Sequence, residues 1–190
     1  MNPEVVTIVS GLPRSGTSMM MSMLEAGGMQ VLTDNIRGAD EDNPKGYYEF
    51  ERVKKTESDP TWVEGAKGKV VKMISALLKQ LPQEYTYKIV FMRRHLGEIL
   101  ASQRQMLIRR GEPTDAVSDE KMAEMFRKHL ESVDVWVDGQ KNVEVIHVSY
   151  NDVLKEPVEQ VNRVNHFLAG ELDAEKMVAV VDRMLYRQRR

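Results

Sequence analysis

The sequence predicts an α/β protein of the three-layer α/β/α kind, with a central parallel β-sheet between two layers of helices. Continuous β-branched runs, such as residues 5–9, are typical of strands that are buried on both faces. Segments with apolar residues at helical spacing alternate with these runs along the chain. With 190 residues, 42% of them hydrophobic, the chain can form one domain around a core, and we expect that domain to span residues 1–190.

The amino-terminal elements follow one another closely. Residues 5–9 form the expected first strand, and residues 17–26 form a helix that ends at Gly27 and Gly28. A short second strand is expected at residues 29–32. Residues 33–60 are polar and rich in turn formers, so we expect a weakly structured segment of the kind that often carries function.

The rest of the chain continues the alternation of apolar runs and helical patterns. The expected strands are residues 69–74, 88–92 and 143–148, and the expected helices are residues 96–110 and 118–137 and two more that begin near Pro157 and after Asp173. We expect the helix at 118–137 to bury one apolar face, formed by Met122, Phe126, Leu130, Val133 and Val137.

Composition limits the kinds of partner and chemistry. The net charge of −2 gives no global field for nucleic acid or anionic membranes, so any anion site has to be local. The absence of cysteine excludes disulfides, thiolate catalysis and cysteine–metal sites. No stretch approaches the roughly 20 apolar residues that span a bilayer, and no signal peptide is visible. We therefore expect a cytoplasmic protein without a membrane span.

The strongest local signal is Gly11-Leu12-Pro13-Arg14-Ser15-Gly16-Thr17-Ser18, between a predicted strand and a predicted helix. Glycines let the backbone approach an anion, and successive amides at a helix N-terminus point toward it. The hydroxyls of Thr17 and Ser18 can donate further hydrogen bonds. The segment predicts a phosphate-binding loop and a P-loop-like fold; the alternative is a purely structural βα turn that holds no ligand.

The cation of this loop is misplaced for a nucleoside-triphosphate site. A triphosphate loop follows GxxxxGK[ST], in which the Lys reaches the phosphates. Gly11 and Gly16 match the two glycines, but Thr17 stands at the Lys position and the cation is Arg14. A kinase without its phosphate lysine would be badly handicapped, so a P-loop kinase is kept only as an alternative.

The Pro-Arg-Ser-Gly-Thr-Ser run resembles the 5′-phosphosulfate-binding loop of sulfotransferases, in the bacterial sulfotransferase-like branch. The resemblance implies a P-loop-like fold and the donor 3′-phosphoadenosine 5′-phosphosulfate (PAPS). It also implies that the sulfonate group is transferred to a hydroxyl or amine. The residues that it assigns to the 5′-phosphosulfate are Arg14, Ser15, Gly16, Thr17 and Ser18.

Two later segments extend the resemblance. In sulfotransferases, an Arg at a strand end and a Ser eight residues later hold the 3′-phosphate, and Arg94 and Ser102 have this spacing. A guanidinium grips phosphate in a bidentate way, and a helical Ser leans back toward the helix N-terminus. Residues 148–157 are similar to the family's Tyr-Glu-Asp-Leu segment. That similarity places Tyr150 near the adenosine; the alternative is a tyrosine packed at a strand end.

The family needs no metal, and no His/Asp/Glu cluster with metal-ligand spacing is visible. Lys72 matches the lysine of the family's Lys-Thr-His-Leu-Pro segment, but Ile74 stands where the catalytic histidine would be. The base is therefore expected elsewhere. Residues 44–49 resemble a Pro-Lys-Gly-aromatic-aromatic-Glu segment of the bacterial branch, in which a buried Glu49 with a raised pKa would accept a proton; the alternative is a turn with a solvated Lys and Glu. Lys45 of that segment would contact the transferred group or the phosphates. His95 is the second candidate base.

Other departures from the family leave alternatives open. Met19 stands where an adenine-stacking Trp is common, and only the tail at residues 187–190 could replace a missing Arg-Lys-Gly loop. A non-catalytic nucleotide-binding scaffold is therefore a further alternative. The expected acceptor is a small molecule, a glycan or a lipid. A homo-oligomer, in which a partner subunit completes the acceptor site, stays open.

Overall fold

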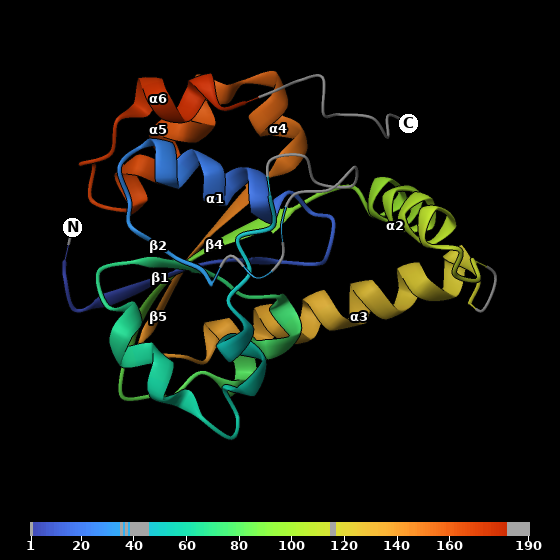
Figure 1. The fold of residues 1–190 in the computed structure, drawn as a ribbon, viewed down its shortest axis with the longest axis horizontal. Helices are drawn as coiled ribbons and strands as arrows, with labels where there is room; N and C mark the ends of the chain where they lie inside the picture. Colours follow the sequence, from blue (N-terminus) through green and yellow to red (C-terminus); the bar gives the residue numbers. More distant parts are fainter. Residues whose placement is uncertain (1, 35, 37, 39–45, 115–116, 182–190) are drawn as a thin grey trace.

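The computed structural model describes residues 2–34, 36, 38, 46–114 and 117–181. In this part of the chain, five parallel strands form one sheet in the order β2-β3-β1-β4-β5, and helices cover both faces (Figure 1). The predicted three-layer α/β/α class is confirmed. The strands are β1 Val5–Gly11, β2 Val31–Leu32, β3 Val70–Lys72, β4 Thr86–Arg93 and β5 Val143–Ser149.

Strand β1 is the central strand and separates β3 from β4. Ile8 pairs with Val71 on one side and with Ile89 on the other. After β1 the chain moves toward β2 and β3, whereas after β4 it moves toward β5. The carboxyl ends of β1 and β4 therefore form the point where the direction of winding reverses, which is where ligands bind in open parallel sheets.

Each face of the sheet has its own core. On one face, Val9, Val90 and Val148 pack with helices α1, α4, α5 and α6. On the other face, Ile8 and Phe91 pack with helix α3 and with short 3₁₀ helices. The helices of the first face are α1 Thr17–Ala26, α4 Tyr150–Lys155, α5 Pro157–Phe167 and α6 Ala174–Ala179; the other elements are α2 Leu96–Arg110, α3 Asp119–Asp138, η1 Glu51–Lys55, η2 Pro60–Ala66 and η3 Ser75–Gln80.

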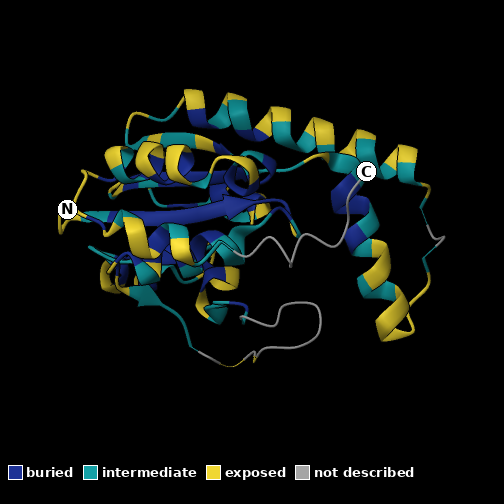
Figure 2. Ribbon diagram, turned by 90° about the horizontal axis from the view of Figure 1, so that it is seen from above, coloured by how far each residue is buried: buried dark blue, intermediate teal, exposed yellow. Residues whose placement is uncertain are grey.

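Helix α2 and the amino-terminal part of α3 extend beyond the carboxyl ends of the strands, and the two helices run in clearly different directions (Figure 2). This arrangement explains why the prediction that α3 buries its whole apolar face was wrong. Val133 and Val137 are buried, but Met122, Phe126 and Leu130 are only partly buried. The amino-terminal half of α3 projects past the sheet with α2 as its neighbour, so one helix cannot cover a full apolar face.

Other differences from the expected elements are local. The second strand is shortened to β2, and the segment expected to be weakly structured contains η1, with η2 beginning at its last residue. Helix α4, which precedes the two expected closing helices, is added directly after β5 because the Ser149 side chain caps it by accepting from the backbone amide of Asp152. Within the described residues, no helix has both the length and the apolarity to cross a membrane.

Candidate functional site

From the end of β1 to the start of α1, the backbone has two positions with conformations that L side chains rarely adopt. Gly11 has φ 148° and Gly16 has φ 98°. A Cβ at Gly11 would lie 2.6 Å from the carbonyl oxygen of Met92, and a Cβ at Gly16 would lie 2.4 Å from Cδ2 of Tyr150. The loop is thus folded tightly against the end of β4 and against α4, and a side chain at either glycine would push it away.

The centre of the loop presents polar groups at the start of α1. The Ser15 side chain is buried, at 1% exposure, and its hydroxyl has no hydrogen-bond partner within the described protein. An unpaired buried hydroxyl is costly, which indicates a site that an added acceptor would complete. Thr17 and Ser18 follow in the first turn of α1 and are partly exposed.

Arg14 connects this loop to the second predicted phosphate site. Its backbone is left-handed, with φ 70°, and its Nε donates to the Ser102 hydroxyl at 2.9 Å. Nη1 of Arg94 donates to the carbonyl oxygen of Arg14 at 3.1 Å. The two predicted anion cradles, one around Arg14 and one around Arg94, therefore lie side by side at the carboxyl ends of β1 and β4.

Arg94 is held by residues that sequence reasoning missed. Its Nε donates to Glu98 Oε2 at 2.9 Å, and Asn151 donates to Glu98 Oε1 at 2.9 Å. The guanidinium carbon lies 4.4 Å from the ring centroid of Tyr150. Tyr150 thus packs between Arg94 and Gly16, at the junction of the two cradles. A Glu four residues after a strand-end Arg, in the first turn of a helix, was the signal for this pair.

Lys72, at the end of β3, reaches the first turn of α1. Its Nζ lies 3.4 Å from the Ser18 hydroxyl, and it also donates to the carbonyl oxygen of Tyr47. Ser18 occupies the position whose hydroxyl binds magnesium in a triphosphate loop. An ammonium group beside that hydroxyl repels a divalent cation, so the local electrostatics oppose a magnesium–nucleotide site.

Glu49 belongs to the same corner of the molecule as Lys72. The backbone carbonyl of Glu49 accepts hydrogen bonds from Thr33 Oγ1 at 2.8 Å and from the Asp34 amide at 3.2 Å. These bonds hold the segment around Glu49 against the residues that follow β2. Glu49 is only partly buried, so the expectation of a buried carboxylate was wrong. Lys45 and the tail at 187–190 lie outside the described residues.

Several solved structures resemble this fold. The sulfotransferase domain of the Synechococcus PCC 7002 olefin synthase matches with a TM-score of 0.56 and 13% identity, over 98% of this chain and 80% of that chain. Mouse sulfotransferase SULT7A1, complexed with PAP, matches with a TM-score of 0.58 and 18% identity, over 93% and 62%. Sulfotransferase STF9 from Mycobacterium avium matches with a TM-score of 0.60 and 14% identity, over 95% and 67%.

The chain has the sulfotransferase fold. The likeness is structural: no protein-family model matches the sequence, and no curated protein matches it by sequence. At 13% to 18% identity, the shared features are the order of the elements and their arrangement in space.

The histidines take different places in this sulfotransferase fold. His95 is 75% exposed, and its Nδ1 lies 3.4 Å from Glu98. His129 Nε2 forms a 2.8 Å hydrogen bond with the Ser75 hydroxyl, and burial, followed by the charge of Lys79, lowers the pKa of His129. In the part of the chain that the structure describes, no three His, Asp or Glu residues are grouped so as to hold a metal ion.

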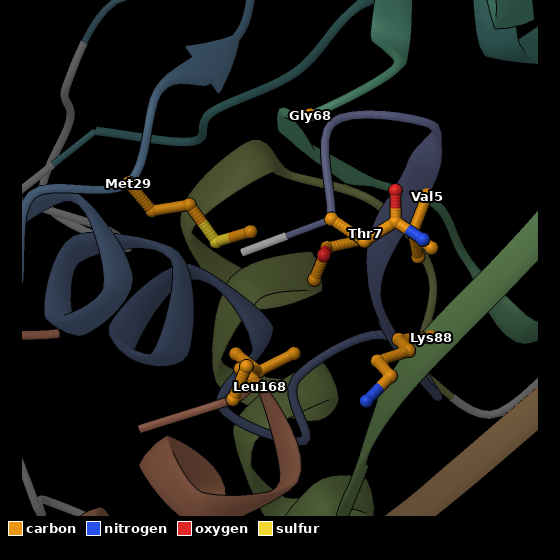
Figure 3. Close-up of a pocket in the computed structure, with 8 residues that line it drawn as sticks. Val5, Thr7, Met29, Gly68, Lys88 and Leu168 are labelled. Carbon is orange, nitrogen blue, oxygen red and sulfur yellow. The ribbon is translucent and has the colours of Figure 1, made fainter. Parts of the chain in front are cut away.

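A separate cavity lies at the opposite end of the sheet (Figure 3). Its lining includes Val5 and Thr7 of β1 and Lys88 of β4, and Thr7 pairs with Lys88. Four residues of extended strand, about 13 Å, separate that pair from the Gly11 end of β1. The ammonium group of Lys88 is bonded to the carbonyl oxygen of Phe167 at 2.7 Å. This cavity is therefore distinct from the two cradles.

Proposed function

We propose that this chain is a sulfotransferase that moves the sulfonate group of PAPS to a hydroxyl or amine of an acceptor by in-line displacement. The observation that carries the proposal is the 2.9 Å hydrogen bond from Arg14 to Ser102. It joins a loop suited to a 5′-phosphate with a strand–helix junction suited to a 3′-phosphate. A nucleotide phosphorylated at both positions is the ligand whose two ends such neighbouring cradles would hold.

The residues fit this donor. The Ser15 hydroxyl is buried without a partner within the described protein, and Gly11 and Gly16 leave no room for a side chain in the loop. Arg14 and residues 15–18 would hold the 5′-phosphosulfate, and Arg94 and Ser102 would hold the 3′-phosphate. When bound, PAPS supplies a sulfonate group already linked to a good leaving group, so the protein has chiefly to place charges and accept one proton.

The remaining tasks fall to Lys72, Arg14 and Glu49. Lys72 Nζ, beside Ser18, and the Arg14 guanidinium provide positive charge where negative charge develops during transfer. The acceptor loses one proton as its oxygen or nitrogen bonds to sulfur, and the Glu49 carboxylate takes that proton. Glu49 follows two residues after Tyr47, whose backbone carbonyl accepts a hydrogen bond from Lys72. Lys45 would add a further cation near the transferred group.

The position of Lys72 favours sulfonate transfer over a kinase reaction. Kinases of the P-loop class require a lysine in the loop and magnesium on the following hydroxyl. Here the loop lysine is replaced by Thr17, and an ammonium group lies 3.4 Å from the hydroxyl of Ser18. Both differences favour a donor that reacts without a metal ion. The acceptor is proposed to be a small molecule, a glycan or a lipid.

The donor is tested by thermal unfolding with added nucleotides. At about a hundred times its Kd, a ligand stabilises the folded chain by about 2.7 kcal/mol, which raises Tm by roughly 5–10 °C for a chain of this size. We expect this shift with adenosine 3′,5′-bisphosphate (PAP) and no comparable shift with ATP and magnesium. The reverse ranking would support the kinase alternative and overturn the proposal.

Turnover is tested separately, with a radiolabelled sulfonate donor and a panel of phenols, sugars and lipid alcohols. Label that moves to an acceptor in the wild-type chain, and not in Lys72→Ala, supports an enzyme. Binding of PAP without transfer to any class of acceptor would instead favour a nucleotide-binding scaffold.

A further inference from the structure

A buried carboxylate lies beneath the two cradles. Glu98 is in the first turn of α2 and its side chain is 2% exposed. Burying an ionised carboxylate is costly unless donors and a positive partner surround it. Burial of the Glu98 carboxylate therefore costs desolvation free energy, and its contacts show which residues it holds in place.

Both oxygens of Glu98 accept hydrogen bonds. Oε2 accepts from Nε of Arg94, and Oε1 accepts from Nδ2 of Asn151, each at 2.9 Å. Each oxygen thus faces a donor from a different segment, the end of β4 on one side and α4 on the other. A glutamine at this position would turn an NH₂ group toward one of these donors, so a carboxylate is the group that satisfies both.

Glu98 reaches both cradles through Arg94. The Arg94 side chain is 8% exposed, its guanidinium carbon lies over the Tyr150 ring at 4.4 Å, and its Nη1 donates to the carbonyl oxygen of Arg14. The same Tyr150 ring packs against Gly16, where an added Cβ would lie 2.4 Å from it. One carboxylate therefore sets the plane of the guanidinium that links the two cradles.

We propose that Glu98 is a positioning residue that orients Arg94 toward the 3′-phosphate, so that the chain discriminates a bisphosphate nucleotide from a 5′-monophosphate. This rests on the proposed function for the identity of the ligand. A positioning role and a purely electrostatic role predict opposite signs. Glu98 offsets the charge of Arg94, so on charge alone its neutralisation would tighten anion binding. Loss of orientation would weaken binding of the 3′-phosphate.

The test compares Glu98→Gln with the wild-type chain by calorimetric titration of PAP and of 5′-AMP, which lacks the 3′-phosphate. We expect the affinity for PAP to fall about tenfold or more, as for loss of one charge-assisted contact. The affinity for 5′-AMP should change by less than about twofold. Glu98→Asp, which keeps two acceptor oxygens and the charge, should lose affinity for PAP in the same direction by a smaller factor.

A matched control is Glu124→Gln on α3. Glu124 forms an i,i+4 pair with Lys128 at 2.7 Å, as Glu98 does with Arg94, but its side chain is exposed. Neither affinity should change in this variant. Thermal unfolding of each variant checks that it is folded, and Glu98→Asp carries the test if Glu98→Gln does not fold.

Three outcomes overturn the inference. Tighter or unchanged binding of PAP in the Glu98 variants would show that charge rather than orientation dominates. An equal loss for PAP and 5′-AMP would show a merely structural role. A wild-type chain that does not prefer PAP to 5′-AMP would overturn the proposed function itself, and this inference with it.

Discussion

The Arg14 guanidinium donates a 2.9 Å hydrogen bond to the Ser102 hydroxyl, although 88 residues separate the two. They meet because β1 and β4 are neighbours in the sheet, with Gly11 paired to Met92 at their carboxyl ends. The loop that follows β1 and the helix that follows β4 therefore start side by side. A ligand that touches one of these segments is within reach of the other.

Replacement of Arg14 by alanine is expected to weaken binding of PAP by about 10- to 100-fold, because a charge-assisted hydrogen bond contributes roughly 1.5–3 kcal/mol. Titration calorimetry with PAP measures the loss. Arg110→Ala is the matched control: Arg110 is exposed in the last turn of α2, far along the helix from Ser102. A similar loss in both variants would mean that overall charge, not the Arg14 cradle, binds the nucleotide.

Gly16 and Gly28 form a pair that separates backbone strain from steric conflict. Their φ angles are 98° and 99°, but a Cβ at Gly16 would meet the Tyr150 ring at 2.4 Å, whereas a Cβ at Gly28 meets nothing within 4 Å. We expect Gly28→Ala to lower the free energy of unfolding by about 1–2 kcal/mol from strain alone. Gly16→Ala should lose more, and it should also lose affinity for PAP.

Denaturant unfolding of both variants measures the difference. The double variant Gly16→Ala/Tyr150→Ala removes the obstructing ring, so Gly16→Ala should cost less in the Tyr150→Ala background than in the wild-type chain. Equal losses for Gly16→Ala and Gly28→Ala would contradict the close packing of the loop on α4.

The sequence predicted the region around β1 well because its signals are local. A β-branched run, two glycines and an apolar helix pattern define residues 5–26 without reference to the rest of the chain. The spacing of Arg94 and Ser102 is also local, since it depends on one strand exit and one helix turn. The proximity of Arg14 to Ser102 is different: it depends on the strand order, which no local pattern contains.

What the sequence did not reveal depends on burial that tertiary packing decides. Glu98 is charged and sits in a helix pattern, and such residues are mostly exposed, so no local pattern indicated its burial. The structure buries it because Arg94 and Asn151 arrive from two other segments. Conversely, the apolar Met122 and Phe126 were expected in the core, but α3 extends past the sheet that would have covered them.

Replacement of Glu49 by glutamine tests the proposed base. Loss of a general base lowers kcat by roughly 10²- to 10⁴-fold, while the affinity for PAP should stay within about twofold because Glu49 is not expected to hold the nucleotide. Glu51→Gln is the matched control, since Glu51 lies two residues on and pairs with Lys54 at 2.6 Å. If kcat survives in Glu49→Gln, His95→Gln is the next variant to compare, and Glu49 is not the base.

Stability should depend on pH through His129. Burial, followed by the charge of Lys79, lowers the pKa of His129 from its ordinary 6.5. The unfolded chain therefore binds a proton more readily than the folded chain, so this contribution to stability is present above about pH 6.5 and is lost as the pH falls toward the lower, folded-state pKa. Burial also lowers the pKa of His147, in the same direction.

The variant His129→Gln tests this dependence. Its amide keeps a hydrogen-bonding group for Ser75 but does not titrate, so His129→Gln should show a smaller fall in Tm between about pH 7.5 and about pH 5.5 than the wild-type chain. Parallel curves for the two proteins would show that His129 is as easily protonated in the folded chain as in the unfolded one.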